Sequence, residues 1–144
     1  MNAATALYTP QVLALATSLA RFPLHPELPF VGTARSATCG SSIKLGLALD
    51  AQCRIADLGL SAHACAIGQA SAAIFAQAAI GLSRGDLNAA LAELEVWLAG
   101  ERDLPVWPGI AVIAAARAYP ARHGAILLSW KAALDALSTV QPDG

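Results

Sequence analysis

The sequence predicts an α+β domain in which a small antiparallel sheet of three strands packs against several helices. Apolar and milder residues alternate over Ser42–Leu49, which is typical of a strand. From residue 66 onward the pattern becomes helical, with leucines spaced along one face. Because the strand patterns come first and the helical patterns later, the order favours α+β. A length of 144 residues fits one domain over residues 1–144.

Composition narrows the classes of function. The 9 basic and 10 acidic residues nearly balance, and the basic residues are scattered singly, so we expect no nucleic-acid partner. No stretch of about eighteen residues lacks charged or strongly polar groups, which argues against membrane insertion. The N-terminus has no basic region of the kind that opens a signal peptide. Three cysteines at irregular spacing do not suggest a disulfide framework, so the sequence predicts a cytoplasmic protein with free thiols.

The first predicted elements are a helix and an irregular segment. Residues 9–20 are expected to form a helix, with Thr9 as its N-cap and Pro10 at the first helical position. Three prolines within residues 21–29 should keep that segment free of regular structure.

A hairpin is predicted after a short strand near residues 32–36. Its first strand is Ser42–Leu49, and Asp50-Ala51-Gln52 fits the turn. Its second strand is expected at residues 53–60. Asp57 falls there at a position due for an apolar residue, which predicts a bulge.

The second half of the chain is predicted to be helical. Residues 66–80 are alanine-rich, and after a break a second helix is expected with Asp86 as its cap and Gly100 at its end. A segment with two prolines then leads into a further helix from Ile110. The last helix is expected to begin near His123.

Cysteine and histidine residues at turns and helix starts are the candidate functional groups. Cys39 is followed by Gly40, which allows a tight turn that exposes the sulfur. Cys65 stands at a helix start, which favours the thiolate that binds metal or attacks sulfur. His123 is expected on the inward side of the last helix. Cys53, in contrast, is expected to be a core residue within a strand.

Four motifs carry these residues in a fixed order. They are Cys39-Gly40, the run Cys65-Ala66-Ile67-Gly68-Gln69-Ala70-Ser71, Leu104-Pro105-Val106 and Arg122-His123. In this order they resemble the scaffold proteins of iron–sulfur cluster assembly, the family of IscU, SufU and the N-terminal domain of NifU. The resemblance covers about residues 31–137, and the run that begins at Cys65 is its most specific part. It implies the same fold, and a scaffold rather than an enzyme.

The resemblance also implies a ligand set for a [2Fe–2S] cluster, or for a zinc or iron ion in its place: Cys39, Cys65 and His123. Ser41 stands where the family has an aspartate, and Gly124 stands where it has a third cysteine. Three ligands are one fewer than a closed tetrahedral site needs. The fourth is therefore expected from water, Ser41, His63 or a partner protein, a second copy of the chain included.

Three functions remain open from the sequence. A scaffold would receive sulfur from a cysteine desulfurase and pass a cluster to acceptor proteins. SufE-like sulfur acceptors resemble this chain in fold and in a Cys-x-Ser loop, so Cys39 could instead carry a persulfide. The third alternative is a docking module of the same pathway that has lost the chemistry, with Val106-Trp107 as its apolar contact.

Overall fold

Three antiparallel strands form the sheet at the centre of the molecule. The computed structural model describes residues 7–37 and 40–138. The strands lie in the order β1-β2-β3, and each pairs with its neighbour in antiparallel register. Their bounds are β1 Phe30–Arg35, β2 Ser42–Leu49 and β3 Ile55–His63. The sheet therefore has the three strands and the antiparallel order that the sequence predicts.

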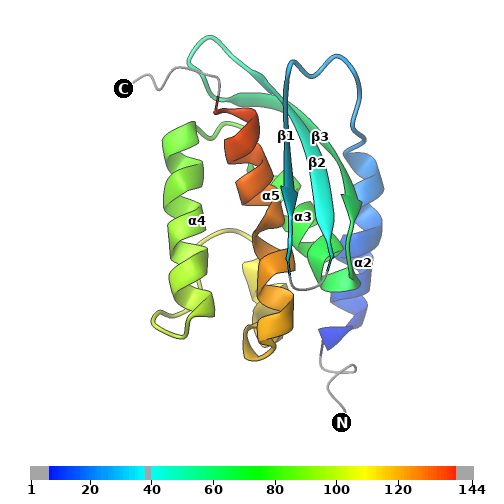
Figure 1. Cartoon of the computed structure of the whole chain (residues 1–144), viewed down its shortest axis with the longest axis vertical. Coiled ribbons are helices and arrows are strands. Elements are labelled where there is room, and N and C mark those ends of the chain that lie inside the picture. Colours follow the sequence, from blue (N-terminus) through cyan, green and yellow to red (C-terminus); the bar gives the residue numbers. More distant parts are fainter. Residues whose placement is uncertain (1–6, 38–39, 139–144) are drawn as a thin grey trace.

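Helices cover one face of this sheet. They are α2 (Pro10–Ser18), α3 (Ala66–Ala78), α4 (Arg84–Leu98) and α5 (His123–Ala136), with 3₁₀ segments η1 (Leu19–Arg21), η2 (Ile110–Ala118) and η3 (Pro120–Arg122). Helix α5 packs on β1 and β2, α3 packs on β3 and α5, and α4 and α2 pack on α5 and α3 respectively (Figure 1). The α+β prediction is confirmed. In the described part of the chain, no helix is long and apolar enough to cross a membrane.

Local signals set the start of α2. The Thr9 hydroxyl accepts a hydrogen bond from the Val12 N–H (3.1 Å), and Pro10 occupies the first helical position, as predicted. The helix is shorter than the expected residues 9–20, because a 3₁₀ turn at Leu19–Arg21 replaces its last residues.

The β2–β3 hairpin contains the predicted bulge. Ala48 pairs with Asp57 and Leu49 pairs with Ile55, so Ala56 has no partner in the register. The extra residue turns Ala56 and Asp57 outward and returns Leu58 to the core. The polar residue that interrupts the apolar pattern therefore marks the bulge.

The strand that follows the turn begins later than predicted, and the prediction that Cys53 is a core residue within a strand is wrong. The Asp50 carboxylate accepts hydrogen bonds from the N–H groups of Gln52 (2.9 Å) and Arg54 (3.0 Å), which extends the turn to Arg54. Cys53 lies in this turn, half-buried, at φ 60°. The strand begins at Ile55 and continues to His63, past the expected end at Leu60.

A glycine allows α5 to lie directly on the sheet. Gly32 of β1 faces the α5 backbone, and a Cβ atom at this position would meet the Ala132 oxygen and the Ala136 nitrogen. The inner face is otherwise apolar. Its buried residues include Ile43, Leu45, Leu47, Ile55, Leu58 and Leu60, and Ala34 and Ala62 are half-buried.

Helix α4 is capped by Ser83, so the prediction that Asp86 is the cap is wrong. The Ser83 hydroxyl accepts the Asp86 N–H (3.2 Å), and the Asp86 carboxylate accepts the Ser83 N–H (3.0 Å). This reciprocal pair is a capping box. The Ser83 N–H lowers the pKa of Asp86 from its ordinary value, so the ionised carboxylate is the form that accepts this hydrogen bond.

Between α4 and α5 the chain forms 3₁₀ turns where the sequence predicts a regular helix. Segment η2 is interrupted at Ile113, whose φ of −105° and ψ of 16° are not helical. The preceding Trp107 is buried with Phe75 and Trp130, and its Nε1–H donates to the Ile74 carbonyl (3.0 Å). Trp107 therefore anchors the start of this segment in the core.

Candidate functional site

The two cysteine segments are attached at the same end of the three strands. Arg35 ends β1 and pairs with Ser42, which begins β2. Ser42 also pairs with His63, the last residue of β3. Cys39 belongs to the connection between β1 and β2 and lies outside the described residues. Cys65 follows β3 by two positions, so the antiparallel order places both connections at this end of the strands.

Cys65 is the N-cap of α3, as the sequence predicts. Its backbone is extended (φ −64°, ψ 169°), and its side chain makes no capping hydrogen bond. The N–H groups of the first turn therefore have no cap from this side chain, and they form the positive end of the helix beside a half-buried thiol.

His123 is held at the first position of α5 by a backbone contact. Its Nε2 lies 2.7 Å from the Arg117 carbonyl oxygen. A carbonyl can only accept, so Nε2 carries the proton and Nδ1 keeps its lone pair in the neutral ring. Among the described residues, Nδ1 has no hydrogen-bond partner. This is the arrangement by which a backbone carbonyl orients a metal-binding histidine.

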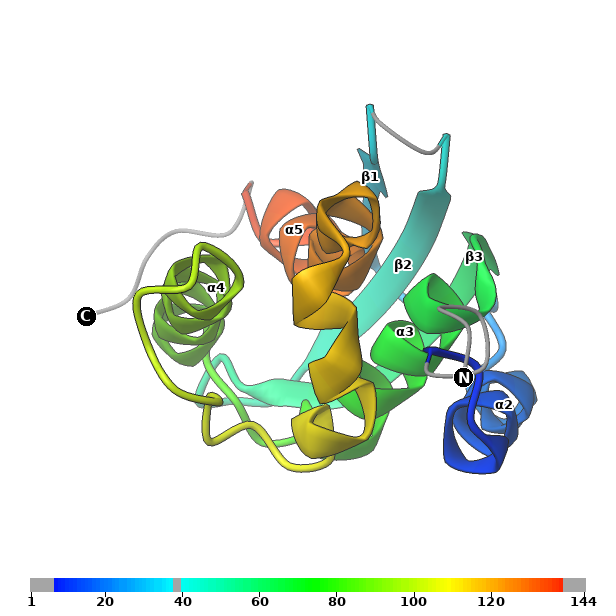
Figure 2. The ribbon, with the colours of Figure 1, turned by 90° about the horizontal axis from the view of Figure 1, so that it is seen from below.

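The starts of α3 and α5 are packed against each other, although they are far apart in the sequence. A Cβ atom at Gly68 would lie 3.3 Å from the Ala125 Cβ, and the buried Ser71 hydroxyl donates to the Ile126 carbonyl (2.7 Å). Both helices begin at the end of the molecule that Figure 2 views, where β1 is also joined to β2. Cys65 and His123 are therefore at neighbouring helix starts.

Gly68→Val is expected to impair metal and sulfide uptake without removing a ligand. A larger side chain at position 68 would push against Ala64 (2.8 Å from the first added carbon) and Ala125, separating the two helix starts. Displacement of a binding group by about 1 Å can cost up to about a hundredfold in function. We expect at least a tenfold weaker uptake on this basis, measured as iron and acid-labile sulfide after anaerobic reconstitution. An unchanged uptake in a folded variant would contradict the role of this contact.

Arg122 adds a polar group without an acceptor beside His123. Its Nη2 lies 3.3 Å from the Tyr8 hydroxyl, but its buried Nε–H has no acceptor among the described residues. A buried donor without an acceptor is costly, and a charged donor more so.

The described residues alone do not complete a metal site. Within residues 7–37 and 40–138, no three His, Cys, Asp or Glu side chains lie close enough to hold a metal ion. Of the alternatives for a fourth ligand, Ser41 is only 4% exposed and His63 lies exposed on the sheet face away from the helices. Cys39 lies outside the described residues, and even with it the set of Cys39, Cys65 and His123 is one ligand short of four.

The backbone near Cys39 has the predicted turn. Gly40 adopts φ 70°, and a Cβ added there would have no atom within 4 Å. The Ser36 N–H donates to the Ser41 carbonyl (2.8 Å), which ties the two ends of the connection together. This short connection is open to solvent at Gly40.

The predicted apolar contact at Val106-Trp107 is wrong for Trp107, which is not at the surface, and stays a prediction for Val106. Val106 is 86% exposed, whereas Trp107 is 8% exposed and belongs to the core. Sequence reasoning also missed the carbonyl of Arg117, because a backbone acceptor leaves no signal in the residue pattern.

Comparisons with known proteins identify the same family as the motifs of the sequence. A family model described as the NifU-like N terminal domain matches residues 20–124. The structure is similar to the crystal structure of an N-terminal NifU-like protein from Brucella abortus, with a TM-score of 0.85, 26% identity and coverage of 96% of each chain. No match was found among the curated proteins.

Two further crystal structures are similar in fold. One is a protein from Fervidobacterium islandicum described as an iron–sulfur cluster assembly scaffold for the SUF system, with a TM-score of 0.77 and 21% identity; the match covers 88% of this chain and 93% of that chain. The other is a hypothetical protein with a TM-score of 0.70 and 24% identity, covering 88% and 96%. These matches confirm the predicted resemblance and its fold.

Proposed function

The chain belongs to the NifU-like N-terminal domain family, and from that premise we propose that it is a scaffold on which iron and sulfide are assembled into a [2Fe–2S] cluster and then passed on. The family is one of iron–sulfur cluster assembly scaffolds, which exchange sulfur and clusters with donor and acceptor proteins. The cluster is cargo in this role, and the protein acts by binding rather than as an enzyme. The cytoplasm, where thiols stay reduced, suits such a protein.

One observation supports this function most: the starts of α3 and α5 pack against each other at the end of the strands where the cysteine segments are attached. Cys65 supplies a thiol at the positive end of α3, and His123 supplies the Nδ1 lone pair. By family resemblance Cys39 is the third ligand. Each of these groups belongs to a segment that the fold joins to the same end of the molecule.

An incomplete ligand set fits a cargo that must leave. Iron–sulfur clusters favour thiolate ligands, so two cysteines and one histidine should hold a cluster less firmly than four cysteines. A coordination position not filled by the chain is open to water or to a side chain of a partner. We propose that a cysteine desulfurase and the acceptor proteins approach the cluster at this position.

Anaerobic reconstitution with ferrous iron and sulfide tests the proposal. Wild-type protein is expected to hold iron and acid-labile sulfide in equal amounts, with visible absorption bands. A single zinc ion without sulfide would be a metal site alone and would contradict the scaffold. Absence of both iron and sulfide would also contradict it.

The open turn at Gly40 favours a second candidate, a sulfur acceptor. In that function, the thiolate of Cys39 attacks the outer sulfur of a persulfide on the desulfurase. A new S–S bond forms on Cys39, the old one breaks, and the desulfurase cysteine leaves as a thiolate. Mass spectrometry after incubation with a cysteine desulfurase and cysteine would show one added sulfur on Cys39. Such a product, together with no iron uptake, would favour this function over the scaffold.

A further inference from the structure

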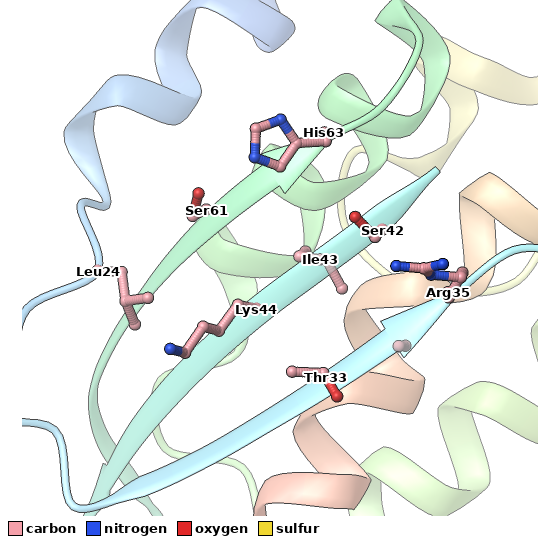
Figure 3. A pocket seen from close by; sticks show the side chains of 9 residues that line it. Leu24, Thr33, Arg35, Ser42, Ile43, Lys44, Ser61 and His63 are labelled. Atoms are coloured by element: carbon pink, nitrogen blue, oxygen red, sulfur yellow. The ribbon is translucent and has the colours of Figure 1, made fainter. Parts of the chain in front are cut away.

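The sheet face opposite the helices carries a regular array of polar side chains. Thr33, Lys44 and Ser61 form one row across the three strands, and Arg35, Ser42 and His63 form the next. Side chains two residues apart along a strand share a face, so both rows point away from the helices. They line a shallow concavity of about 590 Å³ (Figure 3).

Only half of this face is open. Toward the opposite end of the strands, the irregular segment after η1 lies against two glycines. A Cβ at Gly46 would meet the Leu28 side chain, and a Cβ at Gly59 would meet the Pro23 carbonyl. Leu24 of this segment lines one side of the concavity, but most side chains of the two polar rows stay exposed. The open half is therefore the half next to the end of the strands where the cysteine segments are attached.

The open half has a positive charge that no ion pair among the described residues neutralises. Arg35 and Lys44 are exposed, and within the described residues neither forms an ion pair. No acidic side chain lines the concavity. Of the acidic side chains nearby, Asp57 lies 3.4 Å from His25, and Asp135 accepts the Thr33 N–H (2.9 Å). The whole chain has a net charge of −1, so the positive charge of Arg35 and Lys44 belongs to this face and not to the chain as a whole.

We propose that this face binds an acidic segment of a partner protein, whose carboxylates pair with Arg35 and Lys44. Opposite charge on a partner raises the rate and the selectivity of association. A partner bound here would lie beside both cysteine segments. The proposal concerns the sheet face alone and does not depend on whether the chain holds a cluster.

Spacing favours a peptide segment over a small anion. Arg35 and Lys44 lie on adjacent strands and in different rows, so they are diagonal neighbours about 7–8 Å apart. Carboxylates at alternate positions of an extended peptide recur at a similar distance of about 6.8 Å. Both cations are exposed, so neither encloses a single ion. Several carboxylates on one chain would contact the array together.

An NMR titration tests the proposal with a blocked peptide of Glu-Thr repeats as the probe. It is run at an ionic strength of about 0.01 M, where screening is weak. The amide resonances that shift should be those of the residues that line the concavity. Arg35→Gln/Lys44→Gln should weaken binding about tenfold, as expected for two exposed ion pairs of up to about 1 kcal/mol each. The matched control, Arg102→Gln/Lys131→Gln, removes the same charge from other exposed positions and should leave the affinity within about twofold of wild type.

Four results would overturn the proposal. The first is the absence of any shift on the sheet face. The second is an equal loss of affinity in both double variants, which would indicate attraction by net charge alone. The third is equal binding of a Gln-Thr peptide. The fourth is inorganic phosphate shifting the same resonances at lower concentration than the acidic peptide, which would indicate a small-anion site.

Discussion

Cys65→Ser is expected to reduce the iron and sulfide that the protein retains after reconstitution by at least about tenfold, the range found when metal sites lose a supporting group. The substitution keeps a small N-cap residue at the start of α3, so the fold should be preserved. A serine hydroxyl is a poor metal ligand near neutral pH, because it does not readily lose its proton. Retained iron and sulfide, with the visible absorption bands, are the measurement.

Cys53→Ser is the matched control for this prediction. It makes the same chemical change in the turn between β2 and β3, at the opposite end of the strands. This variant should retain as much iron and sulfide as the wild type. An equal loss in both variants, or no loss in either, would remove Cys65 from the proposed ligand set. A circular dichroism spectrum of each variant checks that the comparison is made between folded proteins.

Gly32→Ala is expected to lower the free energy of unfolding by about 3 kcal/mol, the upper part of the range for overpacked cores. The added methyl group would overlap the Ala132 oxygen and the Ala136 nitrogen, and it would lie 2.9 Å from the Ala136 Cα. All three atoms belong to the backbone of α5. Relief would require moving the helix off β1, which would open the contact between the sheet and α5. Urea denaturation followed by tryptophan fluorescence measures the loss.

Gly85→Ala is a control with the opposite expected sign. Gly85 lies in the first turn of α4, and the atom nearest to an added Cβ would be the Ser83 Oγ at 3.8 Å. Alanine is favoured over glycine in helices, so this variant should be more stable by up to about 1 kcal/mol. A loss below about 1 kcal/mol in Gly32→Ala would contradict the close approach of α5 to the sheet, because overpacking normally costs more.

Features that depend on neighbouring residues were predictable from the sequence. The cap at Thr9, the strand Ser42–Leu49 and the bulge marked by Asp57 agree with the structure. The position of Cys65 at a helix start also agrees. Each follows from spacing or from a hydrogen bond that closes within a few residues. The motifs around the cysteines also identified the family, because their order along the chain is a property of the sequence itself.

Features that depend on distant contacts were decided by the tertiary structure. Nothing near Cys65 indicates that Gly68 lets α3 pack against Ala125 and so brings His123 close. Nothing near Lys44 indicates that its side of the sheet stays uncovered. Cys53 and Trp107 also differ from expectation, because a turn and an aromatic cluster override the local pattern. The sequence determined the elements and their chemistry, whereas packing between remote segments determined which side chains meet and which remain exposed.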